Sequence, residues 1–479
     1  MKSEICKSIV FIITIIVFVS CTLNHNQEAD NQWIKPWAEN PAFWQYKGEP
    51  VLLLGATDTD NLFQFHNLEQ HLDLLESVGG NFVRNTMSSR DSGNLWPFYQ
   101  LPDGMYDLER WNDEYWERFE TLLKQCYDRD IIVQIEVWDR FDHSREPWQV
   151  NPLNPNNNNN YTSEQSGLMT DYPNHPWIDE QPLFHTIKGM PRYEPSLEIV
   201  KTYLDRFVDK MLSYSLQYEN VLYCMNNETS TPVEWGQYWM NFIQEKAGEK
   251  GVYTTDMFEH FFRPQSCESC LIALSNPDLY LFLEVSQING RIFGQDHWDT
   301  LQWIMNRRDE YPMRPVNCTK VYGGAMYDWG SGTNEDGVKR FLRNVLGGVA
   351  AVRHHRPHAG NGLNQKAKAS IKTVRKVESV VKLWDIQPQM ELLSNRDCNE
   401  TYLSGNGETF VMYYPRGGSV NVDLTAQNQN LSGRWINVAT GEWAGNFELN
   451  GGNRVELSTP DRAGGWLAVF SSRPFADNG

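Results

Sequence analysis

An apolar run near the middle of the chain ends on the residue pair with the clearest potential for acid/base chemistry. Residues 221–225 have the apolar pattern of a buried β-strand, and Asn227 and Glu228 follow where the run stops. A glutamic acid at a strand end, braced by a neighbouring amide, can transfer a proton to or from a bound substrate. An Asn-Glu pair also arises by chance in a chain of 479 residues, so its position supplies the argument. We therefore predict that Glu228 is a general acid/base.

Proton transfer by a strand-end carboxyl group is typical of glycosidic bond cleavage, in which a second carboxylate attacks the sugar or activates water. The composition favours the same class of ligand, because 18 Trp and 21 Tyr supply many flat rings that can stack on sugars. The alternative for Glu228 is a structural carboxylate in the first turn of a helix, where acidic side chains are common.

The positions of these residues depend on a repeating pattern of strands and helices between about residues 50 and 385. Apolar strand-like segments alternate there with amphipathic helical segments, which is the signature of a parallel sheet covered by helices. Eight repeats favour an α/β fold of the closed (β/α)8 type, a TIM barrel. The eight strands are expected at 51–55, 81–85, 131–137, 221–225, 252–255, 280–285, 315–319 and 349–352.

In a parallel barrel the reactive side chains gather at the carboxyl ends of the strands, where loops vary without disturbing the packed core. Several polar and aromatic residues follow the expected strands at these ends, Asp58 and Arg353 among them. We predict a substrate-binding set drawn from them, made of Asn227, Arg84, Glu136, Trp138, Asp139, Lys320, Tyr322 and His355.

The chain changes character on both sides of the barrel. From about residue 389 short alternating runs separated by Gly and Asn predict a small antiparallel β-sandwich up to residue 479. Within the barrel, residues 140–194 form a long insertion rich in Asn, Pro and Trp, which we expect to be an ordered wall of a cleft. The predicted domains are thus a signal peptide at 1–21, a tether at 22–40, the barrel at 41–388 and the sandwich at 389–479.

The N-terminus has the features of an export signal. Lys2 and Lys7 precede a run at 8–19 that is almost wholly apolar but too short to span a bilayer. The run reaches Cys21, and residues 18–21 resemble a bacterial lipobox, in which the cysteine is lipidated. We expect a protein of the cell envelope, anchored to the outer membrane only through this lipid; plain secretion is the alternative.

Other features exclude classes of function. The net charge of −19 without clusters of Lys and Arg argues against nucleic acid as a partner. Cys267 and Cys270 have the spacing of metal ligands but lack a second pair, so a loop with a local disulfide is the simpler interpretation. A histidine-rich segment at 354–358 lies beside arginines and indicates hydrogen bonding more than metal binding. We expect neither a metal nor a cofactor.

The chain resembles the clan A glycoside hydrolases over nearly its whole length. The Asn-Glu pair of that clan at the fourth strand resembles Asn227 and Glu228, and its second-strand arginine resembles Arg84. The tail, with motifs at 413–418, 434–435, 440–442 and 464–466, is similar to a C-terminal domain labelled collagen-binding that follows such barrels in Bacteroidetes-type lipoproteins. The resemblance implies a glycoside hydrolase acting on a polysaccharide or oligosaccharide, and the domain's label does not imply collagen as ligand.

One position departs from the clan. Its nucleophilic glutamate at the seventh strand is matched here by Lys320, which cannot act as a carboxylate. Another strand-end carboxylate could serve instead, with Glu284 the first choice and Glu136 or Asp139 behind it. Lys320 could also bind an anionic group on the sugar. The remaining alternative is a non-catalytic glycan-binding lipoprotein, because an ammonium near Glu228 lowers its pKa, the wrong direction for an acid.

Overall fold

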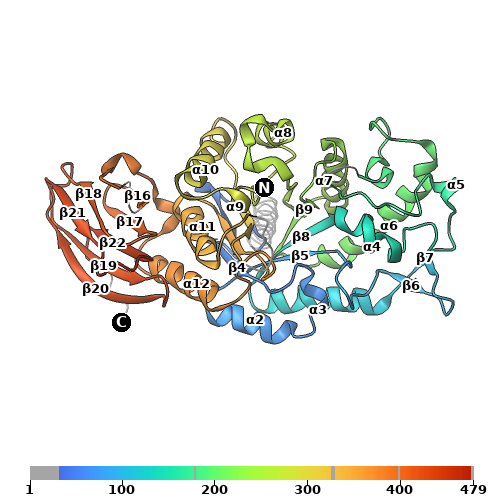
Figure 1. Ribbon diagram of the computed structural model, residues 1–479, viewed down its shortest axis with the longest axis horizontal. Helices are drawn as coiled ribbons and strands as arrows, with labels where there is room; N and C mark the ends of the chain where they lie inside the picture. The colour runs from blue at the N-terminus through green and yellow to red at the C-terminus, as the bar shows by residue number, and fades with distance from the viewer. Residues whose placement is uncertain (1–31, 177–179, 325–329, 397–399, 476–479) are drawn as a thin grey trace, which may run out of the picture.

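The computed structural model describes residues 32–176, 180–324, 330–396 and 400–475. The predicted signal peptide, its lipidation site Cys21 and the tether up to residue 31 lie outside these ranges. Among the described residues no helix combines the length and the apolar character needed to cross a membrane. The central body is an α/β barrel, with a β-sheet domain on one side and the 140–194 insertion on the other (Figure 1).

Eight parallel strands form the barrel, in the hydrogen-bonded order β10-β9-β8-β5-β4-β13-β12-β11. Between β10 and β11 the ring closes through a single bridge from Met257 to Glu284 and a 2.9 Å hydrogen bond from Leu281 N to Thr254 O. The (β/α)8 prediction is therefore confirmed. The strands are β4 (Leu53–Ala56), β5 (Phe82–Thr86), β8 (Ile132–Asp139), β9 (Val221–Asn227), β10 (Thr254–Thr255), β11 (Leu283–Glu284), β12 (Val316–Val321) and β13 (Ala351–His354).

Each barrel strand is followed by a helix that buries one apolar stripe, as the 3.6-residue pattern requires. Side-chain caps fix some of the boundaries: Thr333 and Asp336 form a capping box at α11, and Asn364 accepts from two backbone N–H groups at α12. The helices are α2 (Leu68–Ser77), α3 (Asp113–Asp128), α6 (Glu198–Ser215), α7 (Val233–Ala247), α8 (Glu268–Ser275), α10 (Gly294–Arg308), α11 (Asn334–Leu346) and α12 (Gln365–Glu378).

The insertion between β8 and α6 is ordered by its asparagines. It holds two short helices, α4 (Arg145–Val150) and α5 (Ser163–Ser166), and a hairpin of β6 (Phe98–Gln100) and β7 (Tyr106–Trp111) packs nearby. The Asn154 amide donates to the carbonyls of Trp148 and Thr170, and the Asn158 amide donates to two further carbonyls. These side chains replace the backbone pairing that a loop lacks.

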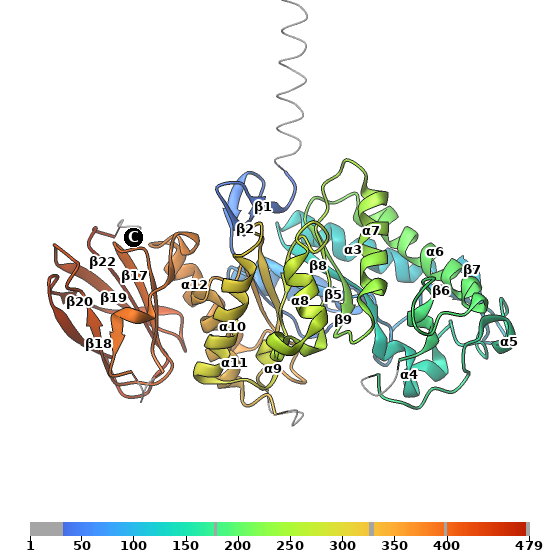
Figure 2. The same ribbon diagram turned by 90° about the horizontal axis from the view of Figure 1, so that it is seen from above.

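A small N-terminal sheet closes one end of the barrel. Strands β1 (Lys35–Trp37), β2 (Asn40–Tyr46) and β3 (Glu49–Val51) pair antiparallel at the end opposite α4 and α9 (Ile288–Arg291) (Figure 2). Trp44 is fully buried and donates its indole N–H to Asn317 Oδ1 at 2.9 Å. The first strand among the described residues thus begins at Lys35, inside the segment predicted as a tether.

The C-terminal region has two antiparallel sheets, in the orders β14-β16-β17-β22-β19-β20 and β15-β18-β21, with a core of their own. The larger sheet also packs on the barrel: Trp298 and Tyr402 lie 4.8 Å apart between ring centroids, and Ser404 Oγ donates to Leu346 O. The strands are β14 (Gln387–Pro388), β15 (Leu393–Ser394), β16 (Tyr402–Gly405), β17 (Thr409–Tyr414), β18 (Ser419–Asp423), β19 (Leu431–Asn437), β20 (Glu442–Leu449), β21 (Arg454–Ser458) and β22 (Trp466–Ser471).

Candidate active site

A cavity of about 680 Å³ opens at the carboxyl ends of the barrel strands. Its volume lies in the range of small-molecule sites, and its position is where parallel barrels carry their active sites. The predicted site residues that line it are Asn227, Glu228, Lys320, Tyr322 and His355. The structure therefore brings together side chains from the ends of three strands. Asn227 and Glu228 lie at the end of β9, Lys320 and Tyr322 at the end of β12, and His355 directly after β13.

Glu228 is held in the cavity by two donors. Lys320 Nζ lies 2.6 Å from Glu228 Oε1, and the Tyr322 hydroxyl donates to the same oxygen at 2.8 Å. Lys320 Nζ also donates to Asn227 Oδ1 at 2.5 Å, so two of the three donors of the ammonium have partners. Glu228 has a φ of 55°, an uncommon backbone conformation for a residue with a side chain. Short hydrogen bonds and an uncommon backbone conformation thus hold the ion pair between Lys320 and Glu228 in place.

The ion pair decides the protonation state of Glu228. Burial alone would raise the pKa of Glu228, but the Lys320 ammonium and the Tyr322 hydroxyl stabilise the carboxylate and hold its pKa well below the usual range. The sequence predicted a proton-carrying acid at this position. The contact with the Lys320 ammonium instead favours the ionised form of Glu228 at neutral pH, and a catalytic role for Glu228 stays a prediction.

A second carboxyl group, Glu259, lines the same cavity. A bridge between Thr229 and Phe258, and a 3.0 Å hydrogen bond from Glu259 N to Thr229 O, place its backbone beside the segment that follows Glu228. Burial raises the pKa of Glu259 to about 7, and the negative charge of Glu228 contributes to the rise, against the opposing charge of Arg140. The surroundings therefore shift the pKa values of these two carboxyl groups in opposite directions, that of Glu228 downward and that of Glu259 upward. Sequence reasoning missed Glu259, because it lies in the weakly patterned stretch that follows a two-residue strand.

Glu284, the first choice for the second carboxylate, lies elsewhere. Its side chain is fully buried and is absent from the cavity wall. It accepts hydrogen bonds from Gln134 Nε2 at 3.0 Å, from Ser286 N at 3.0 Å and from Thr319 N at 3.3 Å. Ser286 Oγ in turn accepts from Lys320 N at 2.8 Å. The structure places Glu284 beneath the site, where it helps to position the strand that carries Lys320.

Arg84 and its partners form a buried network below Asn227. Arg84 Nε donates to Glu136 Oε1 at 2.6 Å, its Nη1 pairs with Asp60, and its Nη2 donates to Asn227 Oδ1 at 3.0 Å. The Asn227 amide donates to Asp139 Oδ2 at 2.9 Å. Arg84, Glu136 and Asp139 therefore do not line the cavity, and they orient Asn227 instead.

Removing the cation of this network is expected to destabilise the protein. In Arg84→Met, Glu136 loses the partner that makes both of its ion-pair contacts, and an unpaired buried charge costs about 3–5 kcal/mol. The free energy of unfolding in urea measures the effect. The matched control is Arg118→Met, which breaks an exposed pair with Glu114 and is expected to cost less than about 1 kcal/mol. Equal losses in the two variants would contradict this assignment.

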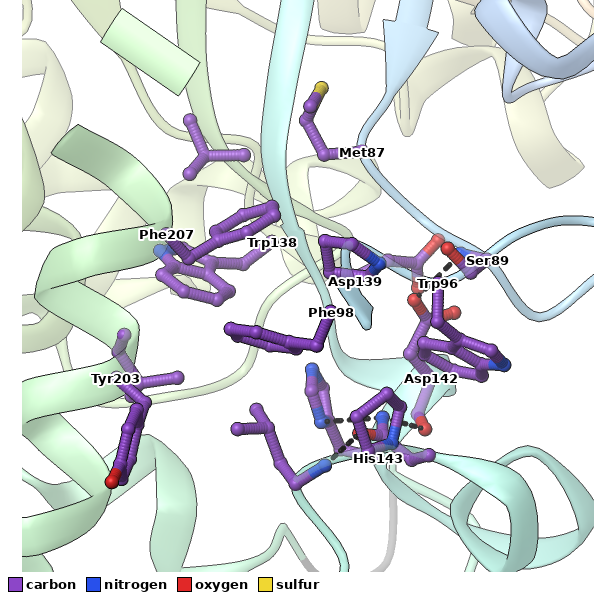
Figure 3. Close-up of a pocket in the computed structure, with 16 residues that line it drawn as sticks. Met87, Ser89, Trp96, Phe98, Trp138, Asp139, Asp142, His143, Tyr203 and Phe207 are labelled. Carbon is purple, nitrogen blue, oxygen red and sulfur yellow. Dashed lines mark hydrogen bonds between the residues drawn. The ribbon is translucent and has the colours of Figure 1, made fainter. Parts of the chain in front are cut away.

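Trp138 does not reach the cavity. Gln134 and Glu136 face the barrel axis, but Trp138 at the end of the same strand packs against the helices, 5.1 Å from Trp239 between ring centroids. It lies beside Phe207 in a separate hollow of about 40 Å³ (Figure 3). The alternation of the strand is interrupted at its end, so the prediction that Trp138 contacts substrate lacks a structural basis.

The candidate metal ligands are accounted for by other contacts. Burial lowers the pKa of His355 well below its ordinary value, although Asp60 lies 3.7 Å from its Nδ1. Cys267 and Cys270 form a disulfide, the simpler of the two interpretations drawn from the sequence. Within the described ranges no group of three His, Cys, Asp or Glu side chains is arranged to hold a metal ion.

Comparisons with known proteins place the fold. No family model matches the chain, and no curated protein matches its sequence. A family 5 glycoside hydrolase from Bacteroides vulgatus superposes with a TM-score of 0.63 at 12% identity, covering 93% of this chain and 94% of that one. A second glycoside hydrolase has a TM-score of 0.61 at 11% identity, with coverages of 93% and 98%. The chain therefore shares its fold, barrel and C-terminal sheets together, with glycoside hydrolases.

Proposed function

We propose that the protein hydrolyses glycosidic bonds of an oligosaccharide or polysaccharide bound in this cavity. The observation that carries the proposal is a pair of carboxyl groups in one cavity, Glu228 in contact with Lys320 and Glu259 in a buried position, whose surroundings shift their pKa values in opposite directions. Two carboxyl groups whose surroundings separate their pKa values are the usual basis for dividing acid and base roles. The shared fold with glycoside hydrolases supports the same reaction class.

The two groups have complementary tasks in this reaction. Glu259 donates its proton to the departing glycosidic oxygen, which removes the need to expel an alkoxide. Glu228, fixed by Lys320 and Tyr322, supplies the negative oxygen that attacks the sugar carbon or accepts a proton from water. Lys320 thus keeps a carboxylate charged, so a lysine at this strand end is compatible with catalysis.

Sugar release from a panel of plant, animal and microbial glycans tests the proposal. Mass spectrometry of the products from the purified protein is expected to show cleavage of at least one glycan. The anomeric configuration of the first product, followed by NMR, distinguishes attack by Glu228 from attack by water. Absence of cleavage across the panel, with intact glycans bound, would contradict hydrolysis.

A second candidate function is glycan capture without cleavage. The observation that favours capture is the direct contact between Lys320 and Glu228, since a carboxylate whose charge is paired with an ammonium is a weaker nucleophile. Calorimetric binding of the same glycan panel distinguishes it from hydrolysis, because capture requires binding that leaves every glycan intact.

The pH dependence of kcat/KM follows from the two carboxyl groups. Activity is expected to fall as the pH rises through about 7, because Glu259 then loses the proton that it must donate. Activity is expected to persist on the acidic side, because the pKa of Glu228 lies well below its ordinary value.

In Lys320→Gln, burial of Glu228 is no longer opposed by the ammonium, so the acidic limb moves to higher pH. An unchanged acidic limb in this variant would remove the role assigned to Lys320.

A further inference from the structure

We propose that the substrate carries a carboxylate or sulfate group, and that Arg145 binds this group beside the ring of Phe141. This inference rests on the proposed function of the cavity and specifies its substrate class. It starts from the distribution of charge over the cavity wall.

The cavity has the opposite charge balance to the whole chain. Five cationic side chains line it against three carboxyl groups, whereas the chain has a net charge of −19. One of the three carboxyl groups, Glu259, keeps its proton up to a pH of about 7, which leaves the wall still more positive. A positive hollow in an acidic protein concentrates anions, because the low-dielectric walls focus the local field.

Most of these cations already have carboxylate partners. Lys320 is paired with Glu228, and Arg90 and Arg356 both contact Asp60. Arg145 differs, because it forms no ion pair with any residue that the structure describes, and its Nε is buried without a hydrogen-bond partner. A guanidinium with unmet donors in a cavity wall is suited to a planar anion such as a carboxylate or to a sulfate.

The Arg145 backbone is also held in an uncommon conformation. Its φ is 56°, and its N–H donates to Tyr172 O at 2.7 Å. Glu228, on the same cavity wall, has a φ of 55°. Side-chain-bearing residues in this region cost free energy and persist where the surrounding structure imposes them, often at functional sites. The two positions that we assign to catalysis and to charge recognition share this feature.

Phe141 supplies the apolar surface that a sugar ring needs. The guanidinium carbons of Arg145, Arg140 and Arg90 lie 5.9, 5.5 and 5.6 Å from the centre of its ring. The ring is half-buried and lines the cavity, so one part of it remains accessible. A pyranose can stack on this ring while an acidic substituent reaches the guanidinium of Arg145. Neutral sugars would use the ring and leave the cation unmatched.

Calorimetric binding tests the inference in the Glu259→Gln background, which retains a neutral group at this position and blocks turnover. The probes are an oligogalacturonide and a chondroitin sulfate oligosaccharide, each compared with a neutral counterpart. The counterpart of the oligogalacturonide is fully methyl-esterified, and that of the chondroitin sulfate oligosaccharide is both desulfated and carboxyl-reduced. At low salt at least one charged probe is expected to bind about 10-fold tighter than its counterpart, the value of about one charge-assisted hydrogen bond. A preference in the oligogalacturonide arm identifies the carboxylate. A preference in the chondroitin sulfate arm alone, lost when the same oligosaccharide is desulfated with its carboxylates intact, identifies the sulfate.

Variants of Arg145 then assign the preference. Arg145→Gln is expected to abolish it, Arg145→Lys to restore part of it, and the exposed Arg118→Gln to leave it unchanged, with thermal unfolding as the check on folding. Equal binding of charged and neutral probes, or equal weakening of both in Arg145→Gln, would overturn the inference. Hydrolysis of neutral glycans without any preference for charge would overturn this inference and leave the proposed function standing. Charge-selective binding by a wild-type protein that cleaves no glycan would support this inference and contradict the proposed function.

Discussion

Replacement of Glu259 by glutamine is expected to lower kcat for natural glycosides by about 10²–10⁴-fold. With a pKa of about 7, Glu259 still carries its proton in about half of the molecules at neutral pH and in most of them below pH 7, and a glutamine amide at the same place cannot donate a proton to a departing oxygen. Substrate binding should change little, because both the protonated acid and the amide are neutral. The measurement is the rate of product release at saturating substrate for wild type and variant.

The leaving group of the substrate distinguishes the loss of a proton donor from general damage to the active site. A dinitrophenyl glycoside expels a stable phenolate and needs no proton, so Glu259→Gln is expected to retain most of the wild-type rate on this substrate. Glu114→Gln, an exposed carboxylate on α3, serves as the matched control. If Glu259→Gln slowed both substrates equally, Glu259 would not be the proton donor.

Glu228→Gln is expected to lower kcat on the order of 10⁴-fold, on natural and dinitrophenyl glycosides alike. The charged oxygen of Glu228 acts on the sugar carbon or on water, and both substrates need this step whatever their leaving group. The change also leaves the Lys320 ammonium without its carboxylate partner, because a glutamine oxygen can accept a hydrogen bond but carries no charge, so the assay is run below the unfolding temperature of the variant. Retention of a tenth or more of the activity on either substrate would contradict the assignment.

The barrel could be predicted closely, because most of its strands are apolar runs next to an amphipathic helix. The expected strand at 315–319 corresponds to β12 at Val316–Val321, and the expected strand at 349–352 to β13 at Ala351–His354. The N-terminal sheet was missed, because Pro36, Pro41 and Pro50 lie in its three strands and proline is typical of linkers and strand edges.

The site could be predicted in part. Glu228, Lys320 and Tyr322 follow strong strands, so their meeting at one end of the barrel follows from the fold. Glu284 also lies near the end of a predicted strand, but a position at a strand end does not reveal whether a side chain enters the cavity or stays among the hydrogen bonds below it. The protonation state of Glu228 depends on its 2.6 Å contact with Lys320, and contact distances between distant strands are set by tertiary packing.

The division of charge between Glu228 and Glu259 is tested most directly by a carboxyl ¹³C NMR titration of protein labelled at glutamate, with Glu228→Gln and Glu259→Gln used for assignment. We expect the signal that disappears in Glu259→Gln to titrate near pH 7 in wild type, and the signal that disappears in Glu228→Gln to remain that of a carboxylate down to the lowest pH at which the protein stays folded. The reverse, a proton on Glu228 at neutral pH and an ionised Glu259, would contradict this account.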